Sequence, residues 1–202
     1  MRSIKARDFT EYLVDKYGES RNAPLLSLAP QVIDLLGVDL ENQAALLYKA
    51  GESEFPYLNF WKISLTPKRK IIKIDAIPSN AVARKLTLLF NKSGVLTEEM
   101  QDIFARATSR PNQYMNLIQR LTQIAKKHPG VYHKDLQAGK NIAFILNAIL
   151  KGVLFHAYQS EVEIKLTGWG SFSLNNRAKG VRSARSLKTL QFVPVQSAKL
   201  ES

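Results

Sequence analysis

The chain has 202 residues, 45% of them hydrophobic, which is enough apolar material for one large domain or two small ones and excludes disorder over the whole chain. Its 29 lysines and arginines outnumber 17 aspartates and glutamates, and the formal net charge of +12 favours a polyanionic partner or a charged assembly partner. Cysteine is absent, which excludes disulfides, zinc ribbons, iron–sulfur clusters and thiol nucleophiles.

The N-terminal segment is charged and has no apolar stretch, so we expect no secretory signal within it. Apolar side chains at Phe9, Leu13 and Tyr17 recur every four residues and predict a short amphipathic helix. A turn with glycine and proline follows. The next region is also helical in pattern, but Pro30 and Gly37 predict that it is broken into two pieces.

Strand-forming residues come next. Residues 55–66 and 71–77 are rich in β-branched and aromatic side chains, and they predict two strands. The short turn between them makes a hairpin whose tip carries three cations, Lys68, Arg69 and Lys70. Pro78 ends the hairpin ahead of a predicted short helix, and Thr97 with the two glutamates after it predicts the start of a connecting helix.

The second half of the chain repeats this order of elements. A short amphipathic helix is predicted by an apolar stripe at Leu117, Leu121, Ile124 and Ala125. A long helix is predicted at 135–158, and its most apolar part, 142–158, is interrupted by polar residues and too short to span a bilayer. Strand-forming segments follow at 162–174 and 187–195, separated by a basic insert.

Two spacings relate the halves. The triplets that begin at Ile63 and Phe172 lie 109 positions apart, whereas Pro78 and Pro194 lie 116 apart, so the second hairpin has gained seven residues between its strands. The charge is divided unequally as well: residues 1–100 carry 14 basic and 12 acidic side chains, and residues 101–202 carry 15 and 5. The electrostatic surface therefore belongs mainly to the second half.

This arrangement resembles the HU/IHF family of bacterial DNA-bending proteins. The family has a G-F-G-x-F turn between its first strands and an F-x-P segment before its last helix, and the matching residues here are Gly168, Trp169, Gly170, Phe172, Phe192 and Pro194. A tight turn between strands needs a positive φ or a missing side chain, which accounts for the two glycines. Pro78 takes the place of Pro194 in the first half.

The resemblance implies an α+β fold with two tandem HU/IHF-like domains, each built as helix, helix, β-hairpin with a basic arm, and short helix. Residues 1–91 would form the first domain, degenerate and with a short arm. Residues 92–111 would be a helical linker, and residues 112–202 the second domain with its basic β-arm. Family members are dimers of chains about as long as each half. The tandem chain is therefore either a fused pseudo-dimer or a chain whose halves pair with neighbouring molecules.

The family wraps DNA with two long β-arms, each with a tip proline that wedges between base pairs. The second arm of this chain has no acidic residue and five cations, at Arg177, Lys179, Arg182, Arg185 and Lys188, which could neutralise phosphates and give salt-dependent, sequence-independent affinity. Neither arm has the tip proline, and the first arm is only the turn 68–70. The resemblance therefore does not imply sharp DNA bending.

A second branch of the resemblance fits these departures. The chain is similar to the IHF-like structural proteins of crAss-like bacteriophages, which implies a virion structural protein, a ring or connector subunit at the portal–tail region. Its partners would be copies of itself and other portal, tail or ring subunits, and it would be assembled into the virion in the host cytoplasm. The alternative is an HU/IHF-type nucleoid protein of the bacterial cytoplasm that binds duplex DNA non-specifically through its basic arm. Neither hypothesis involves a membrane or a small-molecule substrate.

Catalysis has no support in the sequence. There is no G-x-S-x-G, Walker loop or H-E-x-x-H, and the three histidines lack ligand spacing, so we predict no enzyme, no catalytic or metal-binding residue and no cofactor. Gly168 and Gly170 imitate the start of a dinucleotide fingerprint, but Ser173 stands in the place of the third glycine. Trp61 and Trp169 could stack on bases, but their positions on predicted strands favour a place in the core.

Overall fold

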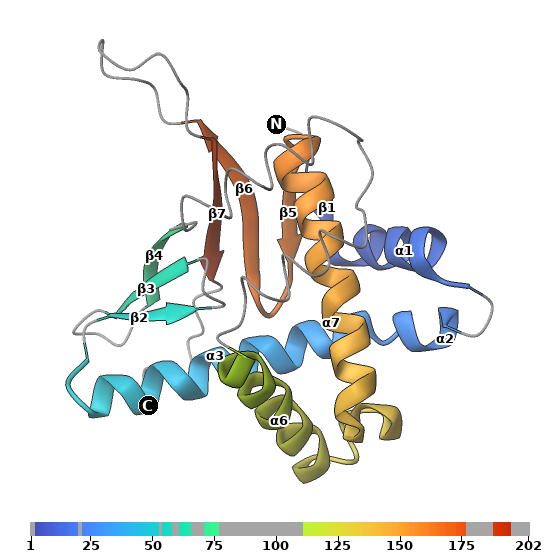
Figure 1. Ribbon diagram of the computed structural model, residues 1–202, viewed down its shortest axis with the longest axis horizontal. Coiled ribbons are helices and arrows are strands. Elements are labelled where there is room, and N and C mark those ends of the chain that lie inside the picture. Colours follow the sequence, from blue (N-terminus) through green and yellow to red (C-terminus); the bar gives the residue numbers. More distant parts are fainter. Residues whose placement is uncertain are drawn as a thin grey trace.

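The computed structural model of the protein describes residues 3–19, 22–52, 54–57, 61–65, 71–76, 111–176 and 188–194. These residues form a mixed α+β structure in which helices pack against a sheet (Figure 1). The elements of the first half are β1 (Ser3–Lys5), α1 (Ala6–Tyr17), α2 (Ala23–Leu26), α3 (Ala29–Lys49), β2 (Glu54–Tyr57), β3 (Trp61–Leu65) and β4 (Ile71–Ala76). Those of the second half are α6 (Pro111–Lys127), the 3₁₀ helix η1 (Lys134–Gln137), α7 (Gly139–Val153), the π-helix η2 (Leu154–Gln159), β5 (Glu163–Leu166), β6 (Gly170–Asn176) and β7 (Lys188–Pro194).

One sheet of seven strands contains the strands of both halves, in the order β1-β5-β6-β7-β4-β3-β2. The strand β1 pairs with β5 in parallel, and the other neighbours are antiparallel. The contact between β4 and β7 joins the two hairpins. The strands of the two halves thus pair with each other within one chain.

A row of apolar residues crosses the whole sheet, one from each strand. The register places these residues opposite one another in the order Ile4, Ile164, Phe172, Phe192, Ile74, Ile63 and Phe55. Phe55 and Ile164 lie 109 positions apart, as do Ile63 and Phe172. The row is therefore symmetric about the pair Ile74–Phe192, and the two hairpins are related by an approximate two-fold axis between β4 and β7.

The register also corrects the spacing that the prolines suggested. Ile63 pairs with Ile74 as Phe172 pairs with Phe192, so the last strands of the two hairpins correspond at 118 positions rather than 116. Ala76, opposite Trp61, is accordingly the counterpart of Pro194, which lies opposite Gly170. Pro78 lies outside the described residues, as do residues 92–110 of the predicted linker; α6 begins at Pro111.

The prediction that the first long helix is broken was wrong, because α3 runs without interruption from Ala29 to Lys49. Pro30 is its second residue, where a helix has no need of the missing N–H. Gly37 allows a close approach instead: a Cβ there would lie 1.8 Å from the carbonyl oxygen of Gly168, in the turn between β5 and β6. The glycine is required by a contact with the other half, not by a helix end.

The second long helix corresponds in length to α3. The prediction of helix at 135–158 is close to the structure, in which η1, α7 and η2 cover residues 134–159 apart from Ala138. The stretch Gly139–Ala157 is long and apolar enough to cross a membrane by length and composition alone, and it is longer than the apolar run seen in the sequence. More than half of it, 56%, is buried against the rest of the protein, which explains its apolar composition.

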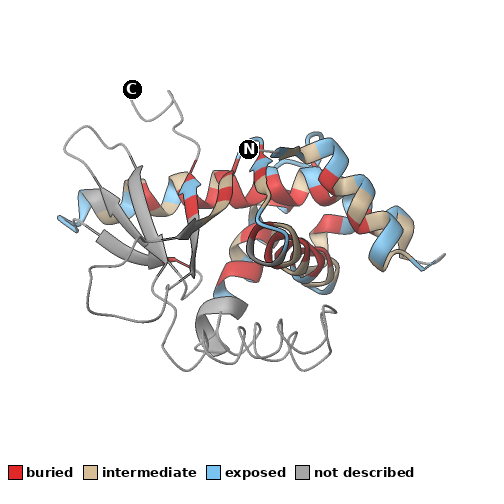
Figure 2. Ribbon diagram, turned by 90° about the horizontal axis from the view of Figure 1, so that it is seen from above, coloured by how far each residue is buried: buried red, intermediate tan, exposed pale blue. Residues whose placement is uncertain are grey.

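The helices of the two halves interlock. Phe9 and Leu13 of α1 lie against Gly152 of α7, so the first helix of one half packs on the second helix of the other. In the same way α6 packs on α3. Figure 2 shows the buried residues gathered on α3 and α7, and they belong to one continuous hydrophobic core. Each half therefore completes its core with helices from the other.

Replacing Gly37 by alanine tests this interlocking. In an ordinary helix interior the change stabilises by roughly 0.5–1 kcal/mol, because alanine is the better helix former. Here we expect Gly37→Ala to lower the free energy of unfolding by roughly 2–3 kcal/mol, since the new methyl group collides with backbone. Urea unfolding measures the change. Gly130→Ala, which meets nothing within 4 Å, is the control; a stabilised Gly37→Ala variant would contradict the close contact.

Candidate functional site

The strongest functional signal in the sequence, the basic arm, lies between β6 and β7. The last pair of this ladder joins Asn176 to Lys188, so residues 177–187 begin and end at neighbouring positions. Lys188 opens β7, while Arg177, Lys179, Arg182 and Arg185 lie outside the described residues. The shorter basic tip, Lys68, Arg69 and Lys70, also lies outside them, between β3 and β4.

The two basic segments leave the sheet at opposite ends of its central strand pair. Ile74 lies opposite Phe192 in an antiparallel ladder, and the tip precedes β4 just as the arm precedes β7. The first residues of these strands are therefore roughly 23 Å apart along the strand direction, at about 3.3 Å per residue. The structure therefore places the strand ends from which the two predicted cationic segments depart far apart on the sheet.

The predicted glycine turn joins β5 to β6. One of its glycines supplies the positive φ that a tight turn needs, and the other supplies the missing side chain. Gly168 has a φ of +93°, which side chains rarely allow. At Gly170 it is the missing side chain that matters, because a Cβ there would lie 2.2 Å from Cε2 of Phe192 and 2.6 Å from the oxygen of Val193. The turn and the strand β7 thus approach too closely for any other residue.

Trp169, between these glycines, lies in the core. Its side chain is almost fully buried, and its indole N–H donates a 2.8 Å hydrogen bond to the hydroxyl of Tyr57 in β2 of the other half. Its ring also contacts the stacked pair of Phe172 and Phe192, whose centroids are 4.7 Å apart. The prediction of a core position is confirmed for Trp169. The side chain of Trp61 lies outside the described residues.

The other face of β5, β6 and β7 carries small and polar side chains. Lys165, Ser171 and Val193 occupy one register row on this face, and Ser173 follows on β6. Val193 is 44% exposed, and Lys165 forms a 3.4 Å ion pair with Glu163. Hydroxyl and ammonium groups on an open sheet can donate hydrogen bonds to an anionic partner, so this face extends the polar surface from which the arm departs.

A buried ion pair that the sequence did not indicate holds the halves together. Arg120 of α6 donates two hydrogen bonds to the carboxylate of Asp39 in α3, at 2.7 and 3.1 Å, and the carboxylate is almost completely buried. The one signal available in the sequence was an acid at an inward position of an apolar helix. This pair fixes the position of α6 on α3.

A second polar contact lies close to the first. The hydroxyl of Tyr132 donates a 2.6 Å hydrogen bond to Asp34 of α3, and the backbone N–H of His133 donates one of 2.7 Å to Gln31. Burial and the neighbouring Asp34 carboxylate raise the pKa of the Tyr132 hydroxyl above its ordinary range. The turn after α6 is therefore anchored to the other half of the chain.

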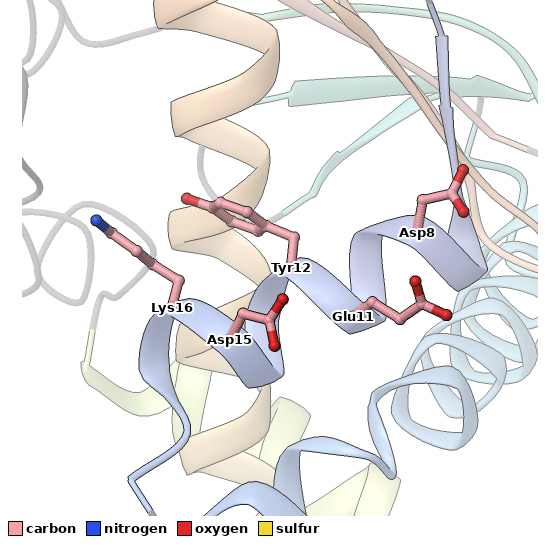
Figure 3. Close-up of a pocket in the computed structure, with 5 residues that line it drawn as sticks. All are labelled: Asp8, Glu11, Tyr12, Asp15 and Lys16. Atoms are coloured by element: carbon pink, nitrogen blue, oxygen red, sulfur yellow. The ribbon is translucent and has the colours of Figure 1, made fainter.

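A shallow hollow of about 390 Å³ lies beside α1 and is lined by Asp8, Glu11, Tyr12, Asp15 and Lys16 (Figure 3). The three carboxylates lie along one side of the helix, and that of Glu11 accepts a 3.1 Å hydrogen bond from the exposed Arg7. Within the described part of the chain, no group of three or more histidine, aspartate or glutamate side chains is placed to hold a metal ion.

His156 lies in the π-helix η2, against α1. Its ring meets that of Tyr12 edge to face at 4.2 Å and contacts those of Phe9 and Phe155. Its Nε2 is buried without a hydrogen-bond partner among the described residues. Burial among these rings lowers the pKa of the His156 imidazole and raises that of the Tyr12 hydroxyl. The His156 imidazole is therefore a titratable group buried where α1 of the first half contacts η2 of the second.

No protein-family model matches the chain, and no match was found among curated proteins or solved structures.

The Asp39–Arg120 pair yields a stability prediction. Arg120→Met leaves the buried Asp39 carboxylate without its partner, and we expect this to lower the free energy of unfolding by about 3 kcal/mol, measured by urea unfolding. Adding Asp39→Asn to that variant should recover part of the loss. Arg7→Met, which removes an exposed ion pair to Glu11, is the matched control and should cost well under 1 kcal/mol. Equal losses in the two arginine variants would contradict the role assigned to Asp39.

His156 yields a prediction of pH dependence. The folded protein holds the pKa of His156 below its ordinary value of 6.5, so the unfolded chain binds a proton first as the pH falls. The stabilising contribution is complete above about pH 6.5 and is lost as the pH falls towards the lower folded pKa. We expect His156→Leu to flatten this dependence in urea unfolding between pH 7.5 and 5, with His128→Leu as the exposed control. If the free energy of unfolding of His156→Leu depended on pH as strongly as that of the unaltered chain, the role assigned to His156 would be contradicted.

Proposed function

We propose that the chain is a non-enzymatic structural protein of a bacteriophage virion, a ring or connector subunit at the portal–tail region, built from two fused HU/IHF-like halves. One observation carries the proposal: a symmetric pair of hairpins has unequal arms. Eleven residues, 177–187, separate β6 from β7, whereas only five, 66–70, separate β3 from β4. Wrapping of a duplex by the resembled family uses two long arms.

The arrangement of the halves supports the HU/IHF-like part of the proposal. The resemblance implies a dimer of short chains, and here two halves meet about an approximate two-fold axis within one sheet. Each contributes two main helices and three corresponding strands, the first half adding the short strand β1, and the helices of one half complete the core of the other. Fusion in one chain allows the two halves to diverge at the surface while the shared core is kept.

The polar contacts suit a building block of fixed shape. Asp39 with Arg120, Tyr132 with Asp34, and Trp169 with Tyr57 all cross between the halves, so the relative position of the halves is fixed by directional bonds as well as by packing. A subunit that occupies a fixed place in a ring needs such a rigid frame. On this reading the single basic arm is a strap to a neighbouring subunit or a contact with packaged DNA.

The second candidate is an HU/IHF-type nucleoid protein. It is favoured by the five cations of the arm and by the open polar face of β5, β6 and β7, from which Lys165 and Ser171 could reach phosphates. Binding of this kind would be independent of sequence, and its log affinity would fall steeply with log salt concentration.

Neutralising the arm separates the two candidates. The variant replaces all five arm cations, Arg177, Lys179, Arg182, Arg185 and Lys188, by glutamine. A ring subunit should then fail to assemble into particles, while its weak binding to duplex DNA changes only as its net charge requires. The control keeps the charge with Arg177→Lys, Arg182→Lys and Arg185→Lys. Virions assembled with each variant are counted, and DNA affinity is measured at several salt concentrations.

The location of the protein decides the matter directly. Mass spectrometry of purified virions should find the chain at a fixed number of copies, and imaging should place it in a ring near the portal. A chain distributed over the bacterial chromosome, with DNA binding that depends on the arm cations, would overturn the structural role in favour of the nucleoid one.

A further inference from the structure

The first helices of the two halves differ in charge at equivalent exposed positions. Phe9 and Leu13 of α1 are buried in the core, as are Leu117 and Leu121 of α6, and these pairs lie 108 positions apart. The same spacing matches the exposed acids Asp8, Glu11 and Asp15 with the exposed amides Asn116, Gln119 and Gln123. Each carboxylate of α1 thus has an uncharged counterpart on α6. The core does not require this difference, because all six side chains point away from it.

The turn after α6 carries the opposite charge. Its exposed cations are Lys126, Lys127, Lys134 and Lys140, with the exposed His128 and His133 among them. Asp135 is the acid within this stretch, and it lies 3.5 Å from His133. Val131 is 67% exposed at the middle of the turn, and its apolar side chain is the most exposed of the large ones in the described residues. The turn therefore has an exposed apolar side chain with exposed lysines before and after it in the sequence; we name residues 126–140 the basic turn.

The outer side of α1 complements this turn. The hollow of Figure 3 is lined by the half-buried Tyr12, whose ring extends toward α7, by the exposed acids Asp8, Glu11 and Asp15, and by Lys16. Arg7 neutralises part of the charge of Glu11. A helix side with three exposed carboxylates beside a half-buried aromatic residue is complementary in charge to a turn with four exposed lysines and an exposed valine. We name the side formed by Asp8, Glu11, Tyr12 and Asp15 the acidic face.

These two surfaces cannot meet within one molecule. Phe9 of α1 lies against Gly152 near the end of α7, whereas the basic turn leads into Gly139 at its start. Thirteen residues of helix separate these points by roughly 20 Å. Figure 1 shows α1 beside one end of α7 and the turn after α6 at the other end.

We infer that the acidic face of one copy binds the basic turn of the next copy. The contact joins two different surfaces, so it is heterologous and repeats from copy to copy into a ring or a filament, unlike the two-fold contact of a symmetric dimer. The inference rests on the proposed function in one respect, because it names the contact by which ring subunits would associate. Charge complementarity identifies the occupant as a second copy of this chain, and the amides of α6 explain why the equivalent surface of the other half does not compete.

Charge reversal tests the contact on the full chain. The acid variant carries Asp8→Lys, Glu11→Lys and Asp15→Lys, and the basic variant carries Lys126→Glu, Lys127→Glu and Lys134→Glu. Sedimentation at low salt should find self-association weakened by about tenfold or more in each variant, and an equimolar mixture of the two should associate again, because the reversed charges are once more opposite. The matched control, Asn116→Lys, Gln119→Lys and Gln123→Lys, adds three positive charges at the equivalent positions of α6, half the charge change of the acid variant, and should associate like the unaltered chain.

Three outcomes would overturn the inference. The first is a chain that stays monomeric at low salt. The second is association that is the same in the charge-reversed variants and in the unaltered chain. The third is loss of duplex DNA binding, but not of self-association, in the basic variant, which would assign the basic turn to nucleic acid. These outcomes are separate from the location test of the proposed function. A virion ring that still assembles after charge reversal refutes only this contact. Charge-dependent self-association of a protein that is spread over the chromosome refutes only the virion role.

Discussion

The pairing of β4 with β7 is the constraint on which the rest of the structure depends. It places Ile74 opposite Phe192 and joins two three-stranded antiparallel units, β2–β4 and β5–β7, into one sheet with a symmetric apolar row. The same arrangement packs α1 on α7 and α6 on α3, so helices cross between the halves on the sheet that the strands form. Burial of Ile164, Phe172 and Phe192 in this row and of the crossed helices is the main favourable term in folding, and the polar contacts of Asp39 and Tyr132 select one relative position of the halves.

The frame is symmetric inside and asymmetric outside, and this contrast links the structure to the proposed function. The strand registers of the halves correspond, and so do the buried leucine and phenylalanine positions of their first helices, whereas arm length and charge on those helices differ between them. Acids on α1 correspond to amides on α6, and the long basic arm belongs to the second half alone. A protein that used both halves in the same way would have little reason for such differences. Distinct surfaces on a rigid frame suit a subunit with different neighbours on its two sides.

Much of the fold could be predicted from the sequence, because repeated patterns of apolar residues are local signals. The strand-forming segments, the long helix of the second half and the core position of Trp169 follow from them, although the segments 55–66 and 162–174 each contain two strands, β2 with β3 and β5 with β6. The continuity of α3 could not be predicted, because Gly37 is required by its close contact with the turn at Gly168, about 130 residues further along the chain. The three-residue strand β1 is too short for a pattern, and the partner of Asp39 depends on the crossing of α6 over α3. Of the candidate site, the sequence identified the arm cations, while the complementary acidic face and basic turn became visible only when buried and exposed positions of the two halves were compared.

Amide hydrogen exchange tests most directly whether the two halves form one interlocked unit. At pH 7, where His156 is neutral, the most protected amides of α3, α7, β4 and β7 should all exchange with the same free energy, equal to that of global unfolding in urea. Destabilising the first half with Gly37→Ala should lower the protection of all four elements equally. A second half whose α7 and β7 stay protected while α3 and β4 exchange would contradict the account, because it would mean that the halves fold independently.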